Sequence, residues 1–123
     1  HRDLPSFPTR RSSDLYFSSH FSPKSQDPTY LAFKKSFARK YRREPDAYSA
    51  LGYDAAKVLI AAMQAAAPLT SETLRDQLSK TRDFPGVTGN ITLDAQRNAI
   101  KPVVILKVED QGNALVKAYT PNS

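Results

Sequence analysis

The alternation of apolar and polar positions divides the chain into a helical first part and a strand-rich second part. Apolar residues recur every three or four positions between residues 28 and 80, which is the period of amphipathic helices. From residue 84 onward, short apolar runs alternate with Gly, Pro and Asn, which is typical of strands joined by turns. Residues 16–22 alternate aromatic and small polar side chains and predict a strand before the helices. The predicted order is strand, three helices, then strands.

The first predicted helix starts at Asp27, a good N-cap residue, with Pro28 at the first helical position. Its aromatic residues, spaced three and four apart, share one face: Tyr30, Phe33, Phe37 and Tyr41. Its basic residues fall mostly on the other side: Lys35, Arg39, Arg42 and Arg43. We expect the aromatic face to pack on the core and the basic face to meet water.

Asp46 is expected to cap a second helix over residues 47–66, which Pro68 ends. The stripe predicted to be buried on this helix is Leu51, Ala55, Val58, Leu59, Ala62 and Met63. Gly52 and neighbouring alanines predict close packing against another element. A third, short helix is expected from Thr70 or Ser71 to about Lys80.

The last forty residues predict a loop over residues 84–90, a short strand at 91–93 and a turn at 94–98. Residues 102–108, PVVILKV, have the length and β-branching of a strand buried on both faces. Residues 114–119 are expected to pair back onto it as a hairpin. A single buried strand lacks the neighbours that a sheet needs, so the pattern indicates a fragment of a larger domain.

Composition excludes several classes of function. The 123 residues include no Cys, which removes disulfide scaffolds, Cys-ligated zinc and thiol nucleophiles. No apolar run approaches the roughly 18 residues that a membrane span requires. The four glycines form no phosphate-binding pattern, and residues 94–98 lack the acidic ligands of a calcium loop. We therefore expect no cofactor, no metal site and no catalytic residues.

The net charge of +6 comes from one segment. Residues 34–43 hold six Lys and Arg and no acidic residue. The rest of the chain therefore has 12 basic and 12 acidic residues and no net charge. Basic and aromatic residues on one helix fit a nucleic-acid site in composition. Because the aromatics and most cations lie on opposite faces, a solvated surface is the favoured interpretation and no nucleic-acid partner is expected.

Residues 1–15 show neither helical nor strand periodicity. Taken alone they predict a disordered basic tail. Residues 6–15, SFPTRRSSDL, also resemble the conceptual translation of a sequencing-library adapter. We therefore treat residues 1–15 as a non-native, disordered leader and leave them out of fold reasoning.

Three stretches carry a family resemblance: FKKSFARKYRREPDAYSALGYDAAKVLIAAM from Phe33, DFPGVTGNITLDAQRN from Asp83, and KPVVILKVED from Lys101. In this order and spacing they resemble the C-terminal third of branched-chain amino acid-type (leucine-binding protein-like) periplasmic substrate-binding proteins, the receptors of ABC importers. The resemblance spans about residues 15–119. It implies the α/β type I periplasmic-binding-protein fold, with two Rossmann-like lobes in the full parent and here an incomplete fragment with about three helices and a C-terminal β-hairpin.

By this resemblance, residues 16–101 form the C-terminal part of the N-terminal lobe, and residues 102–123 return to the second lobe. Residues 15–19 and 99–104 are the second and third crossings between lobes. The resemblance implies a monomeric periplasmic receptor, not an enzyme, which binds an amino acid or similar small carboxylate or amide. Its partner is the ABC transporter permease, and its signal peptide is expected upstream. An extracellular sensory or regulatory domain of the same fold is the alternative.

Tyr48 is the candidate ligand-binding residue. In the family, an aromatic residue in the first turn after a Pro-Asp dipeptide lines the cleft between the lobes, and Tyr48 follows Pro45 and Asp46 at that position. A helix N-terminus favours a carboxylate, and a tyrosine adds an apolar wall with a polar tip. The alternative is a core residue packed above Leu51. His20, with serines nearby, is expected to be a loop histidine near a hinge rather than part of a hydrolytic site.

Overall fold

Two small antiparallel sheets and three helices make up the part of the chain that the computed structural model describes, residues 15–110 and 112–121. The helices are α1 (Pro28–Tyr41), α2 (Ala47–Ala65) and α3 (Ser71–Ser79). The strands are β1 (Tyr16–Ser19), β2 (Phe84–Gly86), β3 (Gly89–Leu93), β4 (Ala99–Ile100), β5 (Val103–Glu109) and β6 (Gly112–Tyr119). The expected leader, apart from Leu15, lies outside the described residues.

The predicted helix starts are confirmed, because each helix begins with a side-chain cap. The Asp27 carboxylate accepts a hydrogen bond from the Thr29 amide at 2.8 Å, and Pro28 is the first residue of α1. The Asp46 carboxylate accepts from the Ser49 amide at 2.8 Å at the start of α2. A capping box involving Thr70 starts α3. These bonds satisfy amide groups that the first helical turn leaves without partners.

The first sheet has the order β1-β5-β6, with β5 in the middle. Phe17 pairs with Leu106 in the β1–β5 ladder, and Leu106 pairs with Leu115 in the predicted β5–β6 hairpin. The expectation that this central strand is buried on both faces is wrong for the described chain. Its two edges are hydrogen-bonded, but Leu106 is its one buried residue, because few described side chains cover its faces.

The segment predicted as a loop over residues 84–90 is instead mostly a tight β-hairpin. β2 pairs with β3, Val87 and Thr88 form the turn, and β4 adds a third strand. Pro85 is tolerated because β2 is an edge strand, where a missing amide hydrogen costs no ladder bond. The rest of this part agrees with prediction, including the short strand after Asn90 and the turn at residues 94–98.

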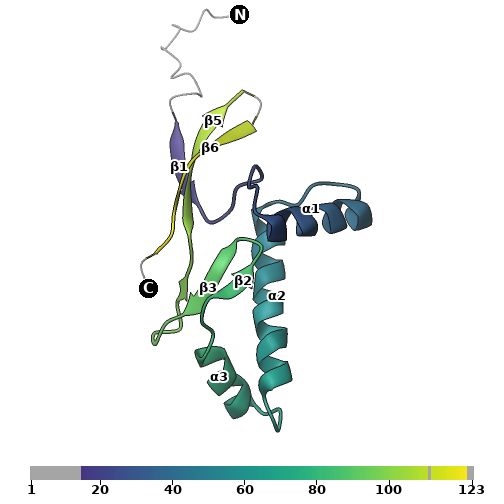
Figure 1. Ribbon diagram of the computed structural model, residues 1–123, viewed down its shortest axis with the longest axis vertical. Coiled ribbons are helices and arrows are strands. Elements are labelled where there is room, and N and C mark those ends of the chain that lie inside the picture. The colour runs from purple at the N-terminus through teal and green to yellow at the C-terminus, as the bar shows by residue number, and fades with distance from the viewer. Residues whose placement is uncertain (1–14, 111, 122–123) are drawn as a thin grey trace, which may run out of the picture.

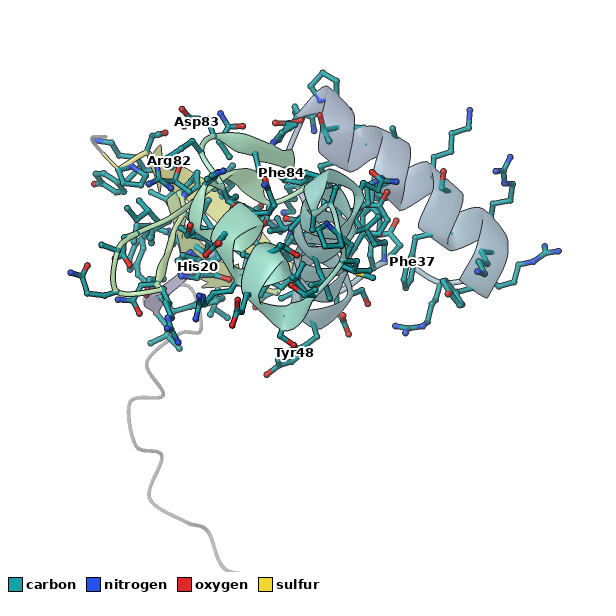
Figure 2. All side chains as sticks on the ribbon, turned by 90° about the horizontal axis from the view of Figure 1, so that it is seen from below. His20, Phe37, Tyr48, Arg82, Asp83 and Phe84 are labelled. Carbon is teal, nitrogen blue, oxygen red and sulfur yellow. The ribbon has the colours of Figure 1, made fainter. Side chains whose placement is uncertain are left out.

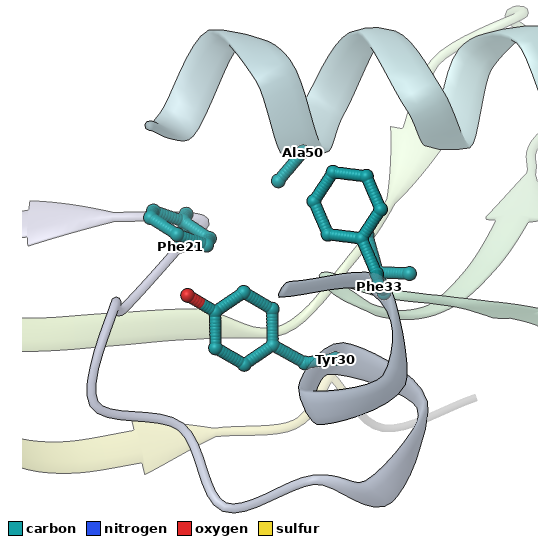
Figure 3. Close-up of a cluster of buried hydrophobic side chains, with 5 residues drawn as sticks. Phe21, Tyr30, Phe33 and Ala50 are labelled. Carbon is teal, nitrogen blue, oxygen red and sulfur yellow. The ribbon is translucent and has the colours of Figure 1, made fainter. Parts of the chain in front are cut away.

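The core lies where the chain leaves β1 and enters α1 and α2. Its buried side chains are Phe21, Tyr30, Phe33, Ala50 and Val87. Figure 3 shows Phe21, Tyr30 and Phe33 gathered beneath Ala50 of α2. The Phe21 and Tyr30 rings meet edge to face, with centroids 5.4 Å apart. Such pairs contribute about 0.5–1.5 kcal/mol beyond the area they bury.

The buried stripe of α2 differs from the predicted one. Its buried residues, with Ala66 just beyond the helix, are Ala50, Asp54, Val58, Ala62 and Ala66. The predicted stripe shares only Val58 and Ala62 with this set, and Leu59 and Met63 are about 40% exposed. The helix turns this face inward because Asp54 is bonded to the β2–β3 turn. The close packing expected at Gly52 is also not seen, since a Cβ there would meet no described atom within 4 Å.

Figure 1 shows how these elements are arranged. The β2–β3 hairpin lies alongside the long helix α2, α3 lies near the far end of α2, and α1 crosses near its first turn. We call the three helices and the β2-β3-β4 sheet the helical group. The β1-β5-β6 sheet stands to one side of this helical group. The described chain passes between the two groups twice, once between β1 and α1 and once between β4 and β5.

Candidate functional site

Tyr48 lies in the first turn of α2 and is 87% exposed. Figure 2 shows its side chain pointing away from the rest of the molecule. The alternative that Tyr48 is a core residue packed above Leu51 requires a buried ring, and the described chain does not bury it. An exposed aromatic ring at a helix N-terminus is available to contact a ligand there.

Asp46 shapes the start of this helix. Its carboxylate accepts hydrogen bonds from the amide and the hydroxyl of Ser49, at 2.8 and 2.7 Å. The Ser49 hydroxyl and then the Ser49 amide hold the pKa of Asp46 below its ordinary value, because both bonds favour the ionised form. The start of α2 thus has the negative charge of Asp46 near Tyr48. The Ser49 amide of the first turn is already bonded to this charge.

Asp54 lies two turns further along α2 and is 2% exposed. Its carboxylate accepts hydrogen bonds from the Val87 amide at 2.7 Å and from the Thr88 amide at 3.0 Å. The Thr88 hydroxyl donates a third at 2.5 Å. A carboxylate with three such donors is well satisfied, so it fixes the β2–β3 turn against α2.

Lys101 completes this buried group. Its side chain is 9% exposed, its Nζ lies 3.9 Å from Asp54 Oδ2, and it donates a hydrogen bond to the Thr88 hydroxyl. Burial lowers the pKa of Lys101 from its ordinary value, and the Asp54 charge opposes that shift. The three side chains link α2, the hairpin turn and the segment that leads into β5.

Two glycines permit this close approach. A Cβ on Gly86 would lie 2.7 Å from Asp54 Oδ2 and 2.8 Å from the Gly89 carbonyl oxygen. Gly89 has a φ of +104°, which favours glycine, and a Cβ there would lie 2.7 Å from the Pro102 ring. The hairpin therefore contacts both α2 and Pro102 through positions without side chains.

His20 connects the two segments that pass between the groups. Its Nδ1 lies 2.9 Å from the Pro102 carbonyl oxygen, a contact that joins the end of β1 to the start of β5. His20 lies in a bend directly after β1, as expected for a loop histidine, and its place near a hinge stays a prediction. The sequence pattern indicated its position, but not its partner 82 residues away.

Two surface grooves lie elsewhere, and Tyr48 lines neither. One, of about 610 Å³, runs between α3 and the turn at residues 94–97. The other, of about 550 Å³, lies between α1 and α2, and half of its lining residues are aromatic: Phe33, Phe37, Tyr41 and Tyr53.

The basic segment is largely exposed, but the expected separation of cations from aromatic rings is incomplete. Arg43 lies over the Phe37 ring at 5.3 Å, and Lys40 lies over the Tyr41 ring at 5.4 Å. Lys34 pairs with Glu44 at 3.2 Å. The helix ends at Tyr41, so Arg43 is free to fold back over the aromatic side. The other residues predicted for the basic face, Lys35, Arg39 and Arg42, are exposed.

Within residues 15–110 and 112–121, no three His, Cys, Asp or Glu side chains are placed to share a metal ion. The helices of the same residues include none that is long and apolar enough to cross a bilayer.

Comparisons with known proteins place the chain in a family. A family model described as periplasmic binding protein matches residues 2–113, a range that overlaps the expected leader. No curated protein matches the chain. The leucine binding protein LivK of Thermotoga maritima MSB8 is 35% identical with a TM-score of 0.77, over 87% of this chain and 31% of its own.

Two further solved structures extend this likeness. One is LivJ of Streptococcus pneumoniae, a branched-chain amino acid transporter substrate binding protein solved with isoleucine. It is 31% identical to this chain, with a TM-score of 0.72, and the match covers 85% of this chain and 30% of LivJ. The other is a solute binding protein of an ABC transporter from R. palustris, solved with benzoate. It is 20% identical, with a TM-score of 0.75, and the match covers 87% of this chain and 30% of that protein. This likeness supports the fold alone.

This chain therefore spans about 30% of the length of these proteins. The family consists of solute-binding proteins rather than enzymes, and its fold is the expected type I periplasmic-binding-protein fold, here as a partial α/β chain with three helices and antiparallel strands. The chain belongs to the periplasmic binding protein family.

Proposed function

We propose that this chain is part of the solute receptor of an ABC importer, which binds a branched-chain or related amino acid between two lobes and closes on it by hinge motion. The observation that carries the proposal is the 35% identity to a leucine binding protein over 87% of the chain. LivJ, whose structure holds isoleucine, supports the same ligand class. The receptor is monomeric and periplasmic, delivers its ligand to the permease subunits, and has no nucleic-acid partner.

The proposed lobes divide where the described sheets divide. Residues 16–101 contribute the three helices and the β2-β3-β4 sheet to one lobe, with β1 as a crossing strand. Residues 102–123 contribute β5 and β6 to the other. The division is supported by the β1–β5 ladder, in which Ser19 pairs with Val104, so the two crossing segments meet at the end of this sheet.

Tyr48 forms one wall of the ligand site in this proposal. Its 87% exposure leaves nearly the whole ring available, and its place in the first turn of α2 puts it at a helix N-terminus, where the backbone amides favour an anion. An amino acid ligand offers an apolar side chain for the ring and a carboxylate for the helix N-terminus. The Asp46 charge beside it suits the ligand's ammonium group.

Calorimetry on the complete receptor with leucine, isoleucine, valine and benzoate tests this function. We expect binding of at least one of the three amino acids. Replacing Tyr48 with Ala should weaken that binding about tenfold or more, since a buried aromatic anchor contributes over 1 kcal/mol. Tyr41→Ala is the matched control, because Tyr41 is also an exposed tyrosine on a helix. Equal affinities in the two variants would remove Tyr48 from the site, and no binding of any amino acid would refute the proposed ligand class.

A further inference from the structure

The buried group of Asp54, Thr88 and Lys101 has no role in ligand contact as proposed above. It joins three segments that are far apart in sequence: α2, the β2–β3 turn, and the residue two positions before β5. Lys101 donates to the Thr88 hydroxyl, which in turn donates to Asp54. Its polar atoms are satisfied, since no buried side-chain nitrogen or oxygen among the described residues lacks a partner.

Stability alone does not account for this arrangement. Removing two charges from water costs several kcal/mol per ion, and an apolar set of similar volume is often as stable or more stable. A hydrogen-bonded ion pair, unlike apolar packing, holds its partner segments in one defined geometry. The geometry is strict here, because Gly86 brings its backbone against Asp54 with no room for a Cβ.

The neighbouring residue, Pro102, is held from two other directions. Its ring lies against Gly89 of the hairpin, and its carbonyl oxygen lies 2.9 Å from His20 Nδ1. Residues 101 and 102 are therefore fixed to the helical group on one side and to the end of β1 on the other. The next residue, Val103, already belongs to the β1-β5-β6 sheet.

We propose that Asp54, Thr88 and Lys101 form a pivot clamp, which fixes the crossing segment before β5 to α2 and so sets the orientation of α2 relative to the β1-β5-β6 sheet. This inference rests on the proposed receptor function, in which the two groups move relative to each other. Tyr48 lies in the first turn of the helix that Asp54 anchors, so its position changes together with that of the clamp. Lys101 is a positioning residue, which acts on the ligand through α2.

A distance measurement without ligand tests the clamp directly. Cysteines introduced at Glu72 in α3 and Lys117 in β6, both exposed and charged, carry spin labels on the two groups, and the chain has no cysteine of its own. In the complete receptor, freed of any other cysteine, we expect one narrow distance distribution. Lys101→Met, which keeps an unbranched stem but no charge, should broaden it and shift its maximum. Lys101→Arg should restore it in part, because a cation again faces Asp54.

The control is Val58→Ala, which removes buried volume one turn further along α2 and leaves the clamp intact. It should lower stability while leaving the distance distribution as in the wild type. A folded Lys101→Met receptor with an unchanged distribution would overturn the proposal, and so would an equal change in Val58→Ala. If Lys101→Met does not fold, Thr88→Val, which removes the bridging hydroxyl at nearly constant volume, is measured instead with the same two outcomes.

L-leucine as a probe separates this inference from the proposed function. In a receptor that binds leucine, Lys101→Met should weaken binding about tenfold if the competent orientation falls to a tenth of its population. Val58→Ala should bind as the wild type does, and equal affinities in Lys101→Met and wild type would count against the clamp. A wild-type receptor that binds no amino acid would refute the proposed ligand class, while the ligand-free distances would still decide on the clamp.

Discussion

The helical group and the β1-β5-β6 sheet are both well hydrogen-bonded, but they differ in what they bury. The helical group includes Tyr30 and Ala50 at 1% and 0% exposure, and its core also takes in Val87 from the hairpin turn. The sheet has one buried side chain, Leu106, while Val116 and Tyr119 are 52% exposed. Regular backbone pairing therefore does not by itself produce a core.

The exposed side chains of the sheet are largely apolar. They include Tyr16, Phe17, Leu115, Val116 and Tyr119. A three-stranded sheet needs a packed face to be stable, and the chain spans about 31% of a similar leucine binding protein. Under the proposed division into lobes, this sheet packs on parts of the second lobe that lie outside this chain, whereas the helical group contains much of its own core.

The largest expected effect comes from removing a ring from the helical core. Tyr30→Ala should lower the free energy of unfolding by about 3–5 kcal/mol, the usual cost of truncating a buried aromatic side chain. Tyr119→Ala in the sheet should change it by less than about 0.5 kcal/mol, because half of that ring is already in water. Urea unfolding of the chain measures both. Similar losses in the two variants would mean that the two regions do not differ as described.

A pair of glycines gives a smaller effect with opposite signs. Gly86→Ala should destabilise the chain by about 1–3 kcal/mol, because its Cβ would press on the buried Asp54 carboxylate. Gly52→Ala should stabilise it by about 0.5–1 kcal/mol, because its Cβ meets no described atom and alanine favours the helix. Thermal unfolding of both variants checks the signs. A destabilising Gly52→Ala would show that this face of α2 is covered.

Local signals predicted much of the fold. Asp27, Asp46 and Thr70 start the three helices as expected, because a cap depends on residues two or three positions away. The hairpin of β5 and β6 was also predicted from its alternation. The buried stripe of α2 was not, because burial is decided by contacts distant in sequence, and the prediction followed the larger apolar residues rather than Asp54.

The candidate site was less accessible to prediction. Tyr48 came from a family resemblance; its ring is exposed, and its role as a wall of the ligand site stays a prediction. The clamp was missed because Asp54 and its partners are 33 or more positions apart. One signal was present, since Asp54 is the single acidic residue of residues 47–65 and lies four positions from Ala50 and from Val58, on one face of the helix. A carboxylate in line with apolar residues at helical spacing predicts a buried partner, which the sequence does not identify.

The smallest expected effect is a pH dependence at the junction between the two regions. Burial lowers the pKa of Lys101, so between that lowered value and 10.5 the unfolded chain binds more protons than the folded one. The free energy of unfolding should therefore rise with pH across that window. Lys101→Met should lack this rise.

Tyr30 opposes the effect at the upper end of the same range. Burial raises its pKa above 10.0, so its contribution to stability is lost as pH rises past that value. The difference in unfolding free energy between wild type and Lys101→Met, each measured by urea titration from neutral pH to 10.5, cancels the tyrosine contribution and isolates the lysine. A difference that stays constant over this range would mean that Lys101 is not desolvated, and the junction would then be open to water as the sheet is.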